Sequence, residues 1–181
     1  LGIKTGIDLP GESKGLVPTV KYFDKAYGKK GWKSSTIISL GIGQAEISLT
    51  PIQLATLATN IANKGYYYMP HIVRKIEDHT FDSTIRWEKI ANSIDTAYYG
   101  LIKRAMSDVV EHGTGYYARL KGISICGKTG TSQNPHGEDH SLFIGFAPKD
   151  NPKIATAVVI ENAGFGGDWA APAASLMIEH Y

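Results

Sequence analysis

Two stretches of the chain place apolar residues three and four positions apart, which is the spacing of one face of an α-helix. The first covers residues 51–62, where Thr50 is expected as the N-cap and Pro51 as the first helical residue. The second covers about Thr96–His112, and a glycine-containing stop signal follows each stretch. The buried face of the second helix is expected to comprise Tyr98, Leu101, Ile102, Ala105, Met106, Val109 and Val110.

Three runs rich in β-branched and aromatic residues predict strands at Ile123–Thr131, Ser141–Ala147 and Lys153–Glu161. The turns between them are short, and short connections favour antiparallel pairing. A last helix is expected to begin after Asp168, which would be its N-cap. In that helix Pro172 would lie in the first turn, with Leu176, Met177 and Ile178 buried.

The remaining segments are less regular. Residues 1–36 are rich in glycine and proline and predict an irregular region with one short helix near Thr19–Tyr27. Tyr66–Ile76 predicts a strand or extended arm, and Phe81–Lys89 is its expected hairpin partner. Because helices precede a group of strands instead of alternating with them, the order favours an α+β fold over βαβ units.

Composition narrows the class of protein further. The chain has 181 residues, of which 43% are apolar and 20% charged, as in ordinary globular proteins. Its 19 basic and 17 acidic residues are interspersed, so the basic patch of a nucleic-acid binder is missing and no nucleic-acid partner is expected. Cys126 is the only cysteine, which excludes an intramolecular disulfide and a cysteine-based zinc site.

The amino-terminal sequence favours a fragment of a longer protein. It begins Leu1-Gly2-Ile3-Lys4, without a methionine or the basic and apolar regions of a signal peptide. No stretch reaches the ~18 apolar residues that a membrane-spanning helix needs. We therefore expect a chain cut before Leu1, with any membrane anchor located upstream.

The tetrapeptide Lys128-Thr129-Gly130-Thr131 is the strongest candidate for chemistry. On a strand, the Lys128 ammonium would supply a positive charge in a partly desolvated cleft. The hydroxyls of Thr129 and Thr131 can hydrogen-bond an anionic group, and Gly130 leaves room for a substrate backbone along the strand edge. The backbone N–H of Thr131 would then be one donor of an oxyanion hole. Lys128 and Thr131 are thus the candidate catalytic residues, and Thr129, Gly130 and Thr131 the candidate substrate-binding residues.

Several blocks of the sequence, in the same order, resemble the transpeptidase domain of class B penicillin-binding proteins, most closely the elongation type. The third active-site motif of that family is similar to residues 127–133, and its following strands and terminal helix are similar to residues 140–148, 154–162 and 168–181. Residues 5–12 and the blocks at Gly41–Gln44 and Thr50–Ala55 resemble further family signatures. The resemblance implies an incomplete penicillin-binding, β-lactamase-like domain of antiparallel strands, packed helices and a C-terminal helix.

The family's nucleophile is the serine of a Ser-x-x-Lys motif, and no Ser-x-x-Lys occurs in this chain. A second motif, of the Ser-x-Asn type, should precede Lys-Thr-Gly, but the only Ser-x-Asn here is Ser132-Gln133-Asn134, which follows it. The resemblance thus implies that residues 1–181 are the C-terminal portion of a transpeptidase domain and are inactive alone. The parent protein would be a peptidoglycan D,D-transpeptidase.

The resemblance also implies the setting of that parent. Its substrates would be D-Ala-D-Ala stem peptides and its inhibitors β-lactams, with no metal and no organic cofactor. The parent would be membrane-anchored at the periplasmic face of the inner membrane, in a cell-wall elongation complex. The fragment itself would be soluble, with its open sheet edge covered by a second copy of the chain or by neighbouring molecules in a crystal.

Other readings of the same residues remain open. A non-catalytic binding or scaffold module is the literal description of the fragment in isolation. Residues 122–129 also match the G-x-x-x-x-G-K-[ST] pattern of a phosphate-binding loop, although Gly130–Pro135 is a poor helix start and such a loop requires a helix there. An earlier triplet, Lys4-Thr5-Gly6, is interpreted as a turn.

Some residue clusters have a structural and a functional interpretation. His136, Glu138, Asp139 and His140 are interpreted as a solvated loop and not as a metal site. Cys126 is expected to be a small core residue. Gly164, Gly166 and Gly167 are expected to form a turn, with the alternative that their N–H groups face a substrate carboxylate. The sequence does not decide whether Tyr116 and Tyr117 pack under the motif or line its cleft.

Overall fold

The three strands at the carboxyl-terminal end form the centre of the computed structural model, which describes residues 4–73 and 89–181. The strands are β3 (Cys126–Ser132), β4 (His140–Ala147) and β5 (Ile154–Ile160), paired antiparallel in the order β3-β4-β5. A separate antiparallel pair joins β1 (Tyr66–Tyr68) to β2 (Lys89–Ala91). The antiparallel pairing predicted for the three strands is confirmed.

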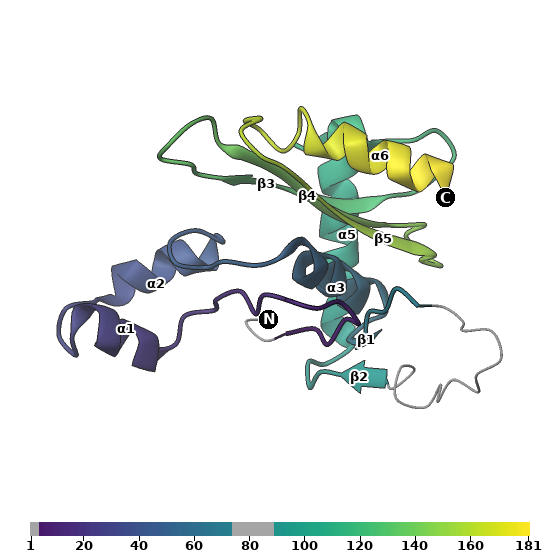
Figure 1. Cartoon of the computed structure of the whole chain (residues 1–181). Coiled ribbons are helices and arrows are strands. Elements are labelled where there is room, and N and C mark those ends of the chain that lie inside the picture. Colours follow the sequence, from purple (N-terminus) through teal and green to yellow (C-terminus); the bar gives the residue numbers. More distant parts are fainter. Residues whose placement is uncertain (1–3, 74–88) are drawn as a thin grey trace.

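Helices cover both faces of the three-stranded sheet (Figure 1). On one face lies α6 (Ala170–His180), and on the other lies α3 (Pro51–Ala62). Helix α5 (Ala97–His112) packs against β3 and leads through a short 3₁₀ helix, η1 (Tyr116–Ala118), into that strand. The mixed α+β architecture expected from the sequence is thus confirmed.

A projecting arm contains α1 (Val20–Tyr27) and α2 (Ser34–Gly41), at the left of Figure 1. Thr19 caps α1 by accepting a hydrogen bond from the N–H of Tyr22, in agreement with the predicted short helix. Helix α2 was not predicted, because no clear N-cap residue precedes its sequence. Its isoleucines lie on an exposed surface. Ile38, for example, is 70% exposed.

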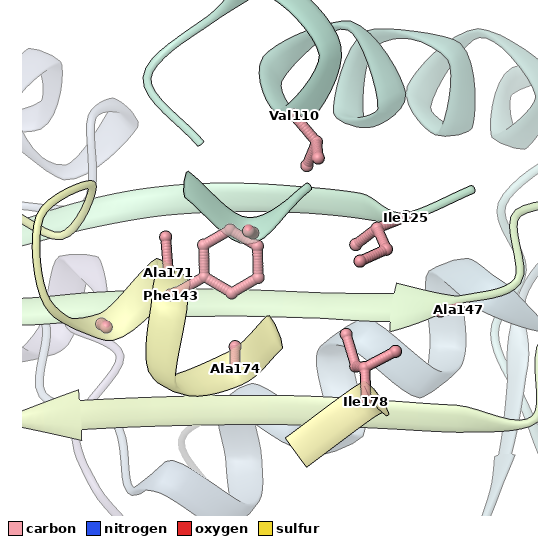
Figure 2. Packing of buried hydrophobic residues seen from close by; sticks show 9 residues of the cluster. Val110, Ile125, Phe143, Ala147, Ala171, Ala174 and Ile178 are labelled. Carbon is pink, nitrogen blue, oxygen red and sulfur yellow. The ribbon is translucent and has the colours of Figure 1, made fainter. Parts of the chain in front are cut away.

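The core on the α6 side is centred on Phe143, which is fully buried. Figure 2 shows Ala171, Ala174 and Ile178 of α6 on the same face of the sheet as Phe143, with Val110 and Ile125 nearby. The Phe143 ring lies on two glycines that face each other across the ladder, Gly127 of β3 and Gly145 of β4. A Cβ added to Gly127 would come within 2.1 Å of Cζ of Phe143, so the position under the ring requires glycine.

The opposite face of the sheet contains a smaller core of Ala62, Met106, Cys126 and Phe146. The Cys126 thiol is buried and donates a hydrogen bond to the carbonyl oxygen of Lys103 at 3.3 Å. Burial raises the pKa of Cys126 to about 11, so the thiolate is disfavoured. Cys126 is therefore the small core residue that the sequence indicated, not a reactive thiol.

The long helices α3 and α5 start and end close to the predicted positions, but the buried face of α5 differs from the predicted one. Thr50 and Gln53 form a reciprocal capping box at the start of α3, as its Thr-Pro sequence indicated. In α5 the predicted face is wrong at four of its seven residues, since Tyr98, Leu101, Ile102 and Ala105 are exposed. Met106 and Val110 are buried as predicted. The buried stripe of α5 instead comprises Tyr99, Lys103, Met106, Ser107 and Val110.

Two predictions for the last helix are also wrong. Leu176 and Met177 are exposed, because α6 turns the small side chains of Ala170, Ala171 and Ala174 toward the sheet. Asp168 is not the N-cap of α6, which begins after Trp169 without a side-chain cap from its own sequence. The predicted hairpin partner Phe81–Lys89 lies almost wholly outside the described residues, and the observed partner of β1 is Lys89–Ala91.

The packing of the Phe143 ring on Gly127 gives a first prediction. Gly127→Ala should lower the free energy of unfolding by about 2–3 kcal/mol, because the added methyl overlaps a buried ring. The measurement is urea unfolding followed by circular dichroism. Gly100→Ala, in α5 with no atom within 4 Å of the added Cβ, is the matched control and should be neutral or stabilising. Equal stability of the two variants would contradict this packing.

Candidate active site

The Lys128-Thr129-Gly130-Thr131 tetrapeptide lies on β3, which is an edge strand of the described sheet. Side chains alternate along a strand, so Thr129 and Thr131 lie on the α6 side together with Phe143, while Lys128 lies on the other side. Lys128 is exposed, and its Nζ donates a hydrogen bond to the carbonyl oxygen of Thr129 at 2.7 Å. The motif thus presents its ammonium and its hydroxyls around a single strand edge.

A cleft of about 350 Å³ lies beside the two threonines. Its lining residues come from three separate parts of the chain: Thr114, Thr129, Thr131, Phe165, Gly166, Gly167 and Asp168. The hydroxyls of Thr114 and Thr129 are hydrogen-bonded, with their Oγ1 atoms 2.6 Å apart. Thr114, Phe165 and Asp168 were not predicted as site residues, because the sequence around them shows only a helix stop and a turn.

The wall formed by residues 165–168 lies directly against the backbone of β3. A Cβ on Gly166 would come within 2.3 Å of the carbonyl oxygens of Gly130 and Leu142. A Cβ on Gly167 would come within 2.5 Å of the carbonyl oxygen of Thr114. These glycines therefore allow the wall to approach the motif more closely than any side chain would permit. The alternative that their N–H groups face a substrate remains a prediction.

Ser141 of β4 holds this wall in place. Its side chain is fully buried, donates a hydrogen bond to the carbonyl oxygen of Phe165 at 3.0 Å, and accepts one from the N–H of Ala170 at 3.0 Å. Ala170 is the first residue of α6, so Ser141 satisfies a free N–H of that helix in place of the predicted Asp168 cap. One hydroxyl thus fixes both the loop and the start of the helix.

The cluster at residues 136–140 makes hydrogen bonds within the protein. The carboxylate of Asp139 accepts from the N–H of Asn134 at 3.1 Å, and Nδ1 of His140 accepts from the N–H of Asn162 at 3.1 Å. His136 is exposed in the loop. In the ranges 4–73 and 89–181, no three His, Cys, Asp or Glu residues are grouped as metal ligands would be.

The phosphate-binding-loop interpretation is wrong. Such a loop requires a helix after Lys128-Thr129, whereas β3 continues without a break to Ser132. Tyr116 and Tyr117, both exposed, lie on η1 and line a different groove together with Arg119 and Lys121. They are not among the residues that line the cleft beside Thr129.

The earlier triplet Lys4-Thr5-Gly6 binds a carboxylate of its own chain. Oε1 of Glu12 accepts hydrogen bonds from the N–H and the hydroxyl of Thr5 at 2.6 and 2.7 Å, and Oε2 accepts from the N–H of Gly6 at 3.1 Å. The hydroxyl of Thr5 is the main cause that lowers the pKa of Glu12. This copy therefore closes a turn, and its Thr5 and Gly6 donors are occupied.

With the edge strand and its cleft defined, the class of the protein follows from comparison. Residues 1–179 match the family described as "Penicillin binding protein transpeptidase domain". The chain belongs to this family, which confirms the resemblance noted in its motifs.

Among the named relatives of the chain are peptidoglycan D,D-transpeptidases called MrdA. The chain is 36% identical to peptidoglycan D,D-transpeptidase MrdA of Acinetobacter baumannii, a match that covers 93% of this chain and 28% of that protein. It is 33% identical to MrdA of Haemophilus influenzae, over 99% of this chain and 31% of that protein. The chain thus spans less than a third of the length of these relatives.

Solved structures show the same fold. The chain is similar to Pseudomonas aeruginosa PBP2 in complex with WCK 5153, with a TM-score of 0.82 and 34% identity over 97% of this chain and 39% of that one. It is also similar to PBP2 of Helicobacter pylori in its complex with MreC, with a TM-score of 0.80 and 26% identity over 99% of this chain and 33% of that one.

The role of Ser141 gives a second prediction. Ser141→Ala should lower the free energy of unfolding by about 1–3 kcal/mol, because the buried N–H of Ala170 loses its acceptor. Hydrogen exchange at the amide of Ala170 should accelerate at the same time. Ser124→Ala is the control, since its hydroxyl is exposed and Lys149 also donates to the carbonyl oxygen of Ser124. An unchanged exchange rate at Ala170 in Ser141→Ala would exclude this role.

Proposed function

We propose that the chain is the carboxyl-terminal part of a serine-type peptidoglycan D,D-transpeptidase. One observation carries the proposal: in a chain of the transpeptidase family, Lys128-Thr129-Gly130-Thr131 occupies an open strand edge beside a cleft lined by threonine hydroxyls. The Thr5 and Gly6 donors of the earlier Lys-Thr-Gly triplet are occupied by Glu12, so they compete poorly for a substrate carboxylate.

In the proposed reaction, the hydroxyl of an upstream serine attacks the carbonyl carbon of the penultimate D-Ala of a stem peptide. The C–N bond to the last D-Ala breaks, and that residue leaves as a free amino acid that takes up the proton from the serine. An amine of a second stem then attacks the acyl-enzyme, forming the cross-link and returning a proton to the serine oxygen. β-Lactams would acylate the same serine.

Each residue of the motif has a part in this proposal. The Lys128 ammonium stabilises negative charge that develops at the reacting centre, and the hydroxyls of Thr129 and Thr131 bind the terminal carboxylate. The N–H of Thr131 donates to the oxyanion, and Gly130 admits the substrate backbone. Thr114 supports the arrangement, because its hydroxyl is hydrogen-bonded to that of Thr129.

The nucleophile in this proposal belongs to a longer protein, and the 181-residue chain by itself is inactive. We propose that the longer protein is anchored in the inner membrane with this domain at its periplasmic face, in an elongation complex. Similarity to MrdA proteins and to a PBP2 solved with MreC supports this setting. Within the described ranges, no helix of the chain combines the length and the apolar character of a membrane span.

Labelling with a fluorescent penicillin tests the function. A protein that joins this chain to an upstream segment with Ser-x-x-Lys should become labelled, whereas the chain alone should not. Lys128→Ala in the longer protein should slow labelling by about 100-fold or more, as expected for loss of a charge that stabilises the transition state. Lys4→Ala, in the triplet that binds Glu12, is the matched control and should label at the normal rate.

The outcomes separate the hypotheses. Absence of labelling in the longer protein, with its fold intact, would favour the non-catalytic module. Labelling of the chain alone would mean that the nucleophile lies within these 181 residues. Equal effects of Lys4→Ala and Lys128→Ala would remove the reason for placing the site on β3.

We also propose that the isolated chain pairs with a second copy along the free edge of β5. Within the described sheet β5 pairs only with β4, which leaves a row of backbone groups available to another strand. Val159→Lys, at this edge, should convert a dimer to a monomer in sedimentation velocity. Leu176→Lys, on the exposed side of α6, is the control and should leave the dimer intact. A monomeric unsubstituted chain would refute the pairing.

A further inference from the structure

A second groove lies at the far end of β3, beyond the Lys-Thr-Gly motif. Its volume is about 580 Å³, and it separates the turn between β3 and β4 from the segment that follows α2. In Figure 1 this segment runs back from the arm below the β3–β4 turn. Gln44 lines the groove on the α2 side, and Ser132, Gln133, Asn134 and Asp139 line it on the sheet side.

The groove has the polarity of a site for a cation and for peptide groups. Its side chains offer amide and hydroxyl groups, and among the lining residues that the structure describes only Asp139 is charged. No lysine, arginine or histidine is among the described residues that line it. A primary ammonium meets a carboxylate and amide oxygens here and no competing positive charge.

Asp139 is held firmly in the wall of this groove. Oδ1 accepts a hydrogen bond from the N–H of Asn134. The backbone oxygen of Asp139 accepts from the N–H groups of Ala163 and Gly164 at 3.0 and 2.8 Å. The side chain of Asn134 bonds to Asn162, which closes the same corner of the sheet. A half-buried carboxylate fixed in this way requires little reorganisation to bind a ligand.

The groove lies within reach of the motif. Ser132 directly follows Thr131 and pairs with His140, so Asp139 lies opposite the residue after Ser132. The rise of a strand is ~3.3 Å per residue, so Asp139 stands about 7 Å along the strand from the level of Thr131. A side chain as long as that of lysine can move its amine from Asp139 to the level of Thr131 while the peptide backbone stays in the groove. The threonine-lined cleft with Gly166 and Asp168 is a different cavity, lined by different residues.

We propose that this groove binds the amine-bearing peptide that accepts the acyl group, and that Asp139 attracts its ammonium. The inference rests on the proposed transpeptidase function and adds the location of the second substrate. Asp139 is a positioning residue: it concentrates the protonated amine, which loses a proton to solvent before it attacks. The acyl bond to the serine then breaks as the new amide bond forms.

Asp139→Asn tests the proposal in the longer protein that contains the nucleophile. The amide keeps an oxygen for the N–H of Asn134 and removes only the charge. Nα-Acetyl-lysinamide is the cationic acceptor, because its side-chain amine is protonated at neutral pH. Hydroxylamine, which is uncharged there, is the second acceptor, and a D-alanyl thioester supplies the acyl group.

The variant should raise the KM for Nα-acetyl-lysinamide about three- to tenfold, as expected for loss of a partly exposed ion pair with a hydrogen bond. The kcat with this acceptor, the KM for hydroxylamine and the rate of acylation by penicillin should stay within about twofold of the unsubstituted protein. Glu138→Gln, which removes the neighbouring exposed acid outside the groove lining, should change none of these values.

Three results would overturn the proposal. Equal changes with the cationic and the uncharged acceptor would show a structural disturbance. Equal effects of Glu138→Gln and Asp139→Asn would show a general field of surface charge. An unchanged KM for the cationic acceptor in Asp139→Asn would place its binding elsewhere. If the unsubstituted protein fails to react with penicillin, the proposed function itself fails, and this failure is distinguishable because it precedes any acceptor.

Discussion

The side chain of Phe143 lies on the backbone of two facing glycines, and the rest of the carboxyl-terminal layer depends on this contact. Because Gly127 and Gly145 have no side chains, the ring lies flat on the sheet, and α6 packs over it with alanines. The end of α5 is drawn in as well, since Gly115 lies beside the same ring. Thr114 thereby reaches Thr129, so a packing contact in the core determines how the cleft is built.

The candidate site is made largely of backbone. One wall is the open edge of β3, and the facing wall is a loop whose glycines touch the carbonyl oxygens of Gly130 and Thr114. Ser141 fixes that loop from inside the protein without lining the cleft. Under the proposed function, such an arrangement holds hydrogen-bond donors and acceptors in place before a substrate arrives, which is the condition for electrostatic stabilisation of a transition state.

Two identical triplets in this chain show that a motif's surroundings decide its use. At Lys4-Thr5-Gly6 the donors lie in a turn seven residues before Glu12, whose carboxylate occupies them. At Lys128-Thr129-Gly130 the strand pairs on one side only, and the described structure places no carboxylate of the chain on its hydroxyls. The residues are the same, but the Thr5 and Gly6 donors of the first triplet already bind a carboxylate of the chain.

Local sequence determined the features that depend on neighbouring residues. Periodicity, capping and short turns predict the Thr50-Pro51 start of α3, the short helix after Thr19 and the antiparallel strands. The candidate tetrapeptide was identified by the chemistry of its residue types and by its resemblance to a family motif. Tertiary structure decided which faces are buried, that Ser141 and not Asp168 satisfies α6, and that Thr114 lies beside Thr129. These contacts join residues far apart in the chain, and their free energy depends on the packing of whole elements, which no local pattern records.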